Sequence, residues 1–192
     1  DAPKLSIAVS PTAVAEGDAS ETSVLTYTVR LRNSGDTADV TSAKATSVTI
    51  ALSGLAANNG GDYVVKDATG NAITVIDGSF SLTIPAGSSS VSFSVDPIGD
   101  TVFEGAETVV ATINAASTSD ASSNSVSLTT ISNKGAATGT ILDDGTNGSD
   151  NDAPKLSIAV SPTAVAEGDA SETSVLTYTV RLRNSGDTAD VT

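Results

Sequence analysis

Residues 91–113 read VSFSVDPIGDTVFEGAETVVATI, and this stretch sets the architecture of the chain. Its two ends, residues 91–95 and 108–113, alternate apolar and polar side chains, which is the pattern of a half-buried β-strand. Between them, residues 96–107 form a short acidic segment with Pro and Gly, the residue types that punctuate strands. The segment therefore predicts two strands joined by a loop that gathers negative charge.

The loop carries three carboxylates, Asp100, Glu104 and Glu107, and contains no Lys or Arg. Like charges this close repel one another unless a cation lies between them. Calcium takes about six to eight oxygen ligands and tolerates irregular loop geometry. We interpret the loop as one wall of a calcium site, and a solvated acidic turn is the alternative interpretation of the same residues.

The alternating pattern recurs in short segments along the first 142 residues. The clearest strand is residues 25–32, whose polar face carries Arg30 and Arg32, and we expect both to pair with neighbouring carboxylates. Pro11 ends the first segment and suits a strand edge or a switch between sheets. Residues 117–124 are rich in Ser and Asp and are expected to form a loop. The expected strands are residues 5–9, 25–32, 48–52, 64–65, 73–75, 80–84, 91–95, 109–113, 126–130 and 137–142. Many short strands separated by turn residues predict an all-β sandwich.

Composition excludes several classes of function. The chain of 192 residues has a formal net charge of -14, so nucleic acid and anionic membrane surfaces would be repelled. It contains no Cys and no His, which excludes disulfides, thiolate or imidazole metal sites, and the usual Ser-His and Cys-His nucleophile pairs. No apolar run reaches transmembrane length, so we expect no direct membrane insertion.

Residues 1–41 recur without a single change as residues 152–192. This repeat predicts a tandem array of near-identical domains; an overlap made by design is the alternative. We expect a sandwich over residues 1–145, an acidic Gly/Asn/Asp linker over residues 146–154, and the incomplete first strands of the next repeat over residues 155–192. That last segment is expected to be disordered alone or to pair with another copy of the chain by β-strand addition.

Four separated motifs occur in a fixed order: Glu16-Gly17, then Gly60-Gly61-Asp62-Tyr63, then the acidic loop, and finally residues 138–144, TGTILDD. In this order they resemble the Calx-beta family, over roughly residues 5–144. The resemblance implies an immunoglobulin-like Greek-key β-sandwich that binds Ca2+ at one end.

The resemblance also implies a set of metal ligands. They are Glu16, Asp62, Asp100, the backbone carbonyl of Val102, Glu104, Glu107, Asp143 and Asp144. The most acidic members of the family carry an Asp at the positions of Gly99 and Gly145. The two glycines leave fewer carboxylates, so we expect one or two ions instead of a full cluster of four.

We therefore expect a calcium-stabilised structural repeat of a secreted or cell-surface bacterial adhesin or matrix filament. It would act as an extender or fibre subunit in adhesion or biofilm, with neighbouring identical repeats as partners. A calcium-sensing regulatory module, as in sodium–calcium exchangers, is the alternative, and identical repeats disfavour it. An enzyme, such as a glycosidase with two carboxylates, is disfavoured because aromatic residues make up only 3% of the chain and Trp is absent.

Overall fold

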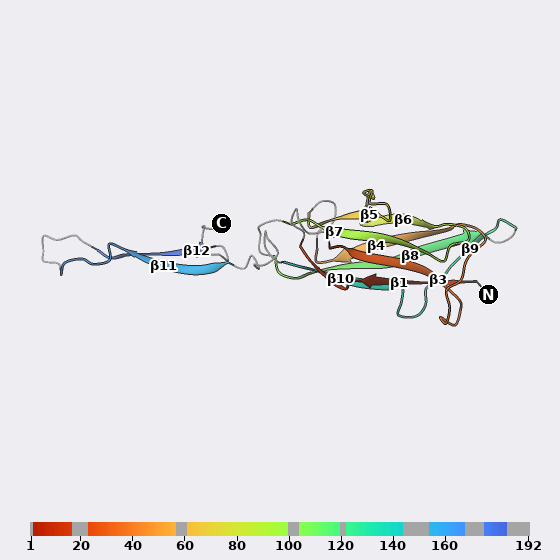
Figure 1. Ribbon diagram of the computed structural model, residues 1–192, viewed down its shortest axis with the longest axis horizontal. Helices are drawn as coiled ribbons and strands as arrows, with labels where there is room; N and C mark the ends of the chain where they lie inside the picture. Colours follow the sequence, from red (N-terminus) through yellow and green to blue (C-terminus); the bar gives the residue numbers. More distant parts are fainter. Residues whose placement is uncertain are drawn as a thin grey trace.

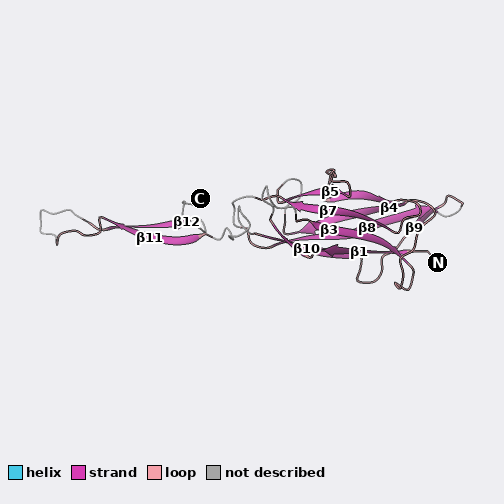
Figure 2. Cartoon of the chain, in the orientation of Figure 1, coloured by secondary structure: helices cyan, strands magenta, loops and turns pink. Residues whose placement is uncertain are grey.

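The computed structural model describes residues 2–16, 23–56, 61–99, 104–119, 122–143, 154–167 and 175–183. Every regular element within these ranges is a β-strand (Figure 2). No helix within these ranges is long and apolar enough to cross a membrane.

Most of the strands form two sheets that face each other across one hydrophobic core (Figure 1). The four-stranded sheet has the order β1-β3-β7-β5, and consists of β1 (Lys4–Ser10), β3 (Leu25–Arg32), β7 (Ser90–Pro97) and β5 (Tyr63–Asp67). The second sheet has the order β2-β10-β8-β4-β6, with β9 paired to β8, and consists of β2 (Ala13–Ala15), β10 (Ala136–Leu142), β8 (Glu107–Ser119), β4 (Thr46–Gly54), β6 (Ser79–Ile84) and β9 (Ser125–Ser127). The prediction of an all-β sandwich is confirmed.

The chain changes sheets at Pro11, which is one of the two roles that the sequence predicted for this residue. Strand β1 pairs antiparallel with β3 in the first sheet, and β2 then pairs parallel with β10 in the second. Because Pro lacks an N–H group, it ends one ladder at the point where the next begins.

Alternation along β3 produces the core. Leu25, Tyr27, Val29 and Leu31 are all fully buried, while the residues between them lie on the outer face of the sheet. On that outer face, the guanidinium groups of Arg30 and Arg32 form ion pairs with Asp36 and Asp39. The expectation that these arginines pair with carboxylates is confirmed.

One buried hydroxyl joins the two sheets. Tyr27 Oη donates to the backbone carbonyl of Val109 on β8 at 2.7 Å and accepts from the N–H of Gly139 on β10 at 3.2 Å. Burial raises the pKa of Tyr27 to about 12, so the hydroxyl stays protonated and remains a donor. A Cβ atom at Gly139 would lie 2.8 Å from this hydroxyl oxygen. The two hydrogen bonds of Tyr27, which tie the sheets together, therefore require glycine at position 139.

Two local expectations were wrong. Residues 117–124 were expected to be a loop, but residues 117–119 belong to β8 and pair with β9, whereas residues 122–124 lie outside the strands as expected. The Ser and Thr side chains of residues 117–119 suit a half-buried ladder as well as a loop, so composition did not separate the two. Residues 73–75 were expected to be a strand, but they belong to none; isolated bridges flank them, between Ala72 and Lys66 and between Ile76 and Ser79.

The remaining two strands form a separate sheet (Figure 1). Strands β11 (Lys155–Ser161) and β12 (Thr177–Arg183) make an antiparallel hairpin, and among the described residues neither strand pairs with a sheet of the sandwich. For the last segment we expected either disorder alone or pairing with another copy of the chain; within the structure its two strands pair with each other. The division of the chain into residues 1–145, 146–154 and 155–192 stays a prediction.

Candidate metal centre

The acidic residues predicted from the sequence lie at the ends of strands, and sheet pairing brings those ends together. Asp62 immediately precedes β5, Glu107 is the first residue of β8, and Asp143 directly follows β10. Strands β8 and β10 run antiparallel, with Ile141 opposite Glu107, so the start of one strand lies beside the end of the other. One end of the sandwich therefore collects carboxylates that are far apart in the sequence.

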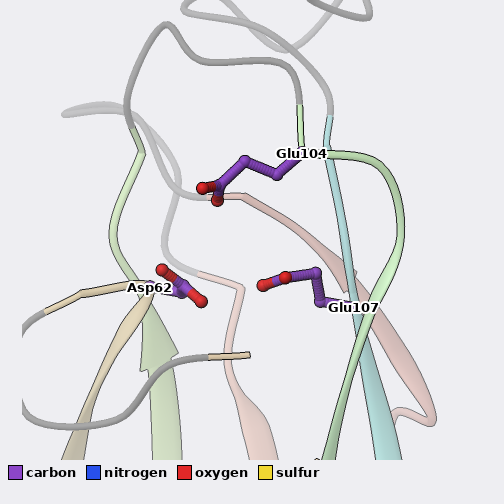
Figure 3. Close-up of side chains that lie close together, drawn as sticks. All are labelled: Asp62, Glu104 and Glu107. Carbon is purple, nitrogen blue, oxygen red and sulfur yellow. The ribbon is translucent and has the colours of Figure 1, made fainter. Parts of the chain in front are cut away.

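Three of these carboxylates converge on one space. Asp62, Glu104 and Glu107 each offer an oxygen atom, and these atoms all lie within 4.8 Å of one another. Figure 3 shows Asp62 facing Glu107 across the end of the sandwich, with the Glu104 carboxylate directed toward the same space. Asp62 directly precedes β5, the edge strand of the four-stranded sheet, and Glu107 begins β8 in the other sheet, so the cluster spans both layers.

The cluster is electrostatically strained without a cation. Burial, a hydrogen bond to the Asp62 side chain, and the negative charges of Asp62 and Glu104 together raise the pKa of Glu107 to about 7. The raised pKa means that burial and the neighbouring carboxylates disfavour the ionised form of Glu107. A bound divalent cation would reverse this preference, since its positive charge favours all three ionised carboxylates.

A fourth acidic residue, Asp143, holds the start of β8 and the residues before it in place. Asp143 Oδ2 accepts hydrogen bonds from the backbone N–H groups of Glu104 and Gly105, at 2.7 and 2.9 Å. Gly105 has a φ of 77°, a left-handed conformation that side chains other than glycine rarely adopt. Asp143 and Gly105 together therefore fix the backbone from which Glu104 reaches the cluster.

The sequence did not predict this positioning role; it placed Asp143 among the ligands, and that assignment stays a prediction. The available signal was the Glu104-Gly105 pair, since a glycine directly after a candidate ligand indicates a special backbone conformation. Asp143 lies beside the cluster but outside the group of three converging carboxylates.

The other predicted ligands have different positions. Glu16 follows β2, is only 6% exposed, and donates its backbone N–H to the carbonyl of Leu142 at 2.8 Å; it lies outside the converging group. Asp100, Val102 and Asp144 fall outside the described residues, and their assignment as ligands stays a prediction.

The donor set fits a hard divalent cation. All three converging groups are carboxylates, which suit Ca2+ and Mg2+ and not the softer transition metals. Two of them come from strand ends and one from the loop before β8, so the separations between oxygens can adjust. That adjustable geometry favours Ca2+ over Mg2+, which requires near-ideal octahedral coordination. Asp62, Glu104 and Glu107 are the residues that would hold the ion, and the three together suit one ion.

Comparison with known proteins gives matches among solved structures alone. No protein-family model matches the sequence, and no curated protein matches it. An apo-form Calx CBD1 domain is 18% identical, with 73% of this chain and 98% of that chain covered and a TM-score of 0.43. The calcium binding domain CBD12 of CALX1.1 is 20% identical, with 72% and 44% covered and a TM-score of 0.44. A cohesin module from a Clostridium perfringens family 33 glycoside hydrolase is 13% identical, with 73% and 96% covered and a TM-score of 0.40.

Proposed function

We propose that this chain is a calcium-stabilised β-sandwich repeat with a structural role. The observation that carries the proposal is the convergence of Asp62, Glu104 and Glu107 from both sheets and from the loop before β8. An ion held by all three would tie these elements together and remove the repulsion among them. The ion would therefore stiffen the end of the sandwich that leads into the rest of the chain.

The expected size of this effect can be estimated. Extracellular modules bind Ca2+ with dissociation constants of about 10⁻⁴ to 10⁻³ M. At about 100 times the dissociation constant, one site adds roughly 2.7 kcal/mol to the free energy of unfolding. Because a domain of this kind holds only about 5–15 kcal/mol in total, one ion would account for a large share of its rigidity.

The wider setting that we propose is a secreted or cell-surface bacterial protein, an adhesin or matrix filament built from such repeats. Three features support it: the unchanged recurrence of residues 1–41, the acidic composition, and the absence of Cys. Identical units suit a role in which length and stiffness matter more than the chemistry of any one unit. The chain's work in this proposal is mechanical and not catalytic.

The test is thermal unfolding of the whole chain in calcium, in magnesium, and in excess chelator. We expect calcium to raise the melting temperature by about 5–10 °C, from roughly 2–4 °C per kcal/mol for a domain of this size, and magnesium to raise it less. The variant Asp62→Asn should lose most of the gain. Asp39→Asn is the matched control, because Asp39 lies outside the cluster and pairs with Arg32, the last residue of β3. This variant should keep the increase in melting temperature that calcium produces.

Equal melting temperatures in calcium and chelator would overturn the proposal. A large, reversible change of shape on calcium titration, with little change in stability, would instead favour a calcium-sensing module. Solution scattering of the same samples separates these two outcomes.

A further inference from the structure

The β11–β12 hairpin repeats β1 and β3 of the sandwich in sequence and in register. Leu156 lies opposite Leu182 as Leu5 lies opposite Leu31, and the whole ladder between Lys155 and Ser161 follows the same pairing as that of β1. The hairpin is therefore the same building block as the first two long strands of the sandwich.

The surroundings of the two copies differ sharply. Tyr27 is 0% exposed in the sandwich, whereas its counterpart Tyr178 is 62% exposed; Ile7 is 4% exposed and Ile158 is 67% exposed. The other large apolar residues exposed on the hairpin and the segment entering it are Leu156, Val175, Leu176, Val180 and Leu182. An apolar face this continuous marks a surface made for a partner.

The sandwich itself shows what covers this face. Strand β3 pairs along its edge with β7. Its Tyr27 hydroxyl bonds across the core to Val109 on β8 and to Gly139 on β10. Leu25 fills the space that the missing side chain of Gly139 leaves. The residues that cover this apolar face in the sandwich therefore come from the part of the repeat that follows β3, residues 42–143.

A complete second copy of the chain is a poor occupant. Its own β1 and β3 already cover its residues 42–143, and they have the same sequence as the hairpin. Exchange of one hairpin for the other would create no new contact, and it would replace a tethered segment, held at high effective concentration, by an untethered one. The occupant must lack its own first two long strands.

We propose that the β11–β12 hairpin is the first part of a second sandwich, completed by a polypeptide with the sequence of residues 42–143 from a further copy of the repeat. The interface between the hairpin and this polypeptide would be specific, because the Tyr178 hydroxyl would form hydrogen bonds with the counterparts of Val109 and Gly139, as the Tyr27 hydroxyl does. This inference deepens the structural-repeat part of the proposed function, and it does not depend on the calcium site.

The test uses the whole chain and, as a probe, a polypeptide of residues 42–151 added by dilution from denaturant. We expect a one-to-one complex in size-exclusion chromatography with light scattering, and slower hydrogen exchange at residues 155–161 and 177–183. Tyr178→Asp, which places a charge on the apolar face, should weaken the complex by about 100-fold or more. Ala159→Asp is the control, because the counterpart Ala8 is exposed in the sandwich, and it should bind as the unmodified chain does.

The absence of a complex, or a complex that Tyr178→Asp leaves unchanged, would overturn the proposal. A self-associated form of the whole chain that Tyr178→Asp abolishes would also overturn it, because the occupant would then be a second hairpin. If the probe precipitates, a chain extended after Thr192 by residues 42–151 answers the same question. Hairpin amides that exchange as fast in the extended chain as in the original would contradict the proposal. Each experiment is run in calcium and in chelator, so a failure of the calcium proposal is recognised separately.

Discussion

The buried tie between the sheets gives a sharp test of the fold through the variant Gly139→Ala. The added Cβ would lie 2.6 Å from Leu25 Cδ1, 2.9 Å from Leu25 Cδ2 and 2.8 Å from Tyr27 Oη. All three distances are well inside ordinary van der Waals contact. Leu25 and Tyr27 are both 0% exposed, so neither can swing into solvent to relieve the overlap.

The cost has two parts. Overpacking of a well-packed core costs about 1–3 kcal/mol. Displacement of the Tyr27 hydroxyl also weakens its hydrogen bonds to Val109 and Gly139, and each buried group left without a partner costs about 1–3 kcal/mol. Alanine recovers roughly 0.5–1 kcal/mol relative to glycine in a strand. We therefore expect Gly139→Ala to lower the free energy of unfolding by about 2–4 kcal/mol.

The assay is urea unfolding followed by far-ultraviolet circular dichroism at one fixed calcium concentration. Gly35→Ala is the matched control, because the Cβ there would meet only Thr37 Cγ2 at 4.0 Å; it should change stability by less than about 0.5 kcal/mol. In a Tyr27→Phe background the cost of Gly139→Ala should fall, since one of the overlapping atoms is gone. A Gly139→Ala variant as stable as the unmodified chain would refute the account of the tie.

Three further predictions concern the cluster and the core. Glu107→Gln removes a charge from the cluster, so it should raise the melting temperature in chelator. It should also reduce the increase in melting temperature that calcium produces. Thermal unfolding in chelator and in calcium measures both changes. In chelator, the free energy of unfolding should fall as the pH rises from about 4.5 to about 7. Burial and the neighbouring carboxylates raise the pKa of Glu107 to about 7. In this pH range the folded state therefore binds more protons than the unfolded state, and a rise in pH destabilises it. Urea titrations across this pH range should show the slope, and Glu107→Gln should flatten it. Thr46→Val should stabilise the chain by about 1 kcal/mol in urea unfolding, because the Thr46 hydroxyl is fully buried and has no hydrogen-bond partner among the described residues.

Local patterns predicted the strands well where one face is buried. Residues 25–32 alternate in sequence, and their burial alternates in the same phase along β3. The pattern failed over residues 117–119, where both faces are polar and pairing with β9 decides the structure. Local alternation also could not predict the hydrogen bond between Tyr27 and Gly139, since those residues lie 112 positions apart.

The sequence predicted a cluster of carboxylates at one end of the sandwich, but not which of them share one space. The sequence shows acidic residues at the ends of several strands, and sandwich topology brings such ends together. Which carboxylates share one space depends on strand register and on the path of the loop before β8. Asp62, Glu104 and Glu107 converge, whereas Asp143 accepts hydrogen bonds from the loop and Glu16 lies outside the group.

The most direct measurement is a calcium titration of the whole chain followed by backbone amide NMR. We expect saturable shifts at Asp62, Glu104, Gly105 and Glu107, complete below about 10 mM calcium, with the amides of β11 and β12 unmoved. Shifts that never saturate, or that spread evenly over the acidic surface, would contradict a calcium site at this end of the sandwich.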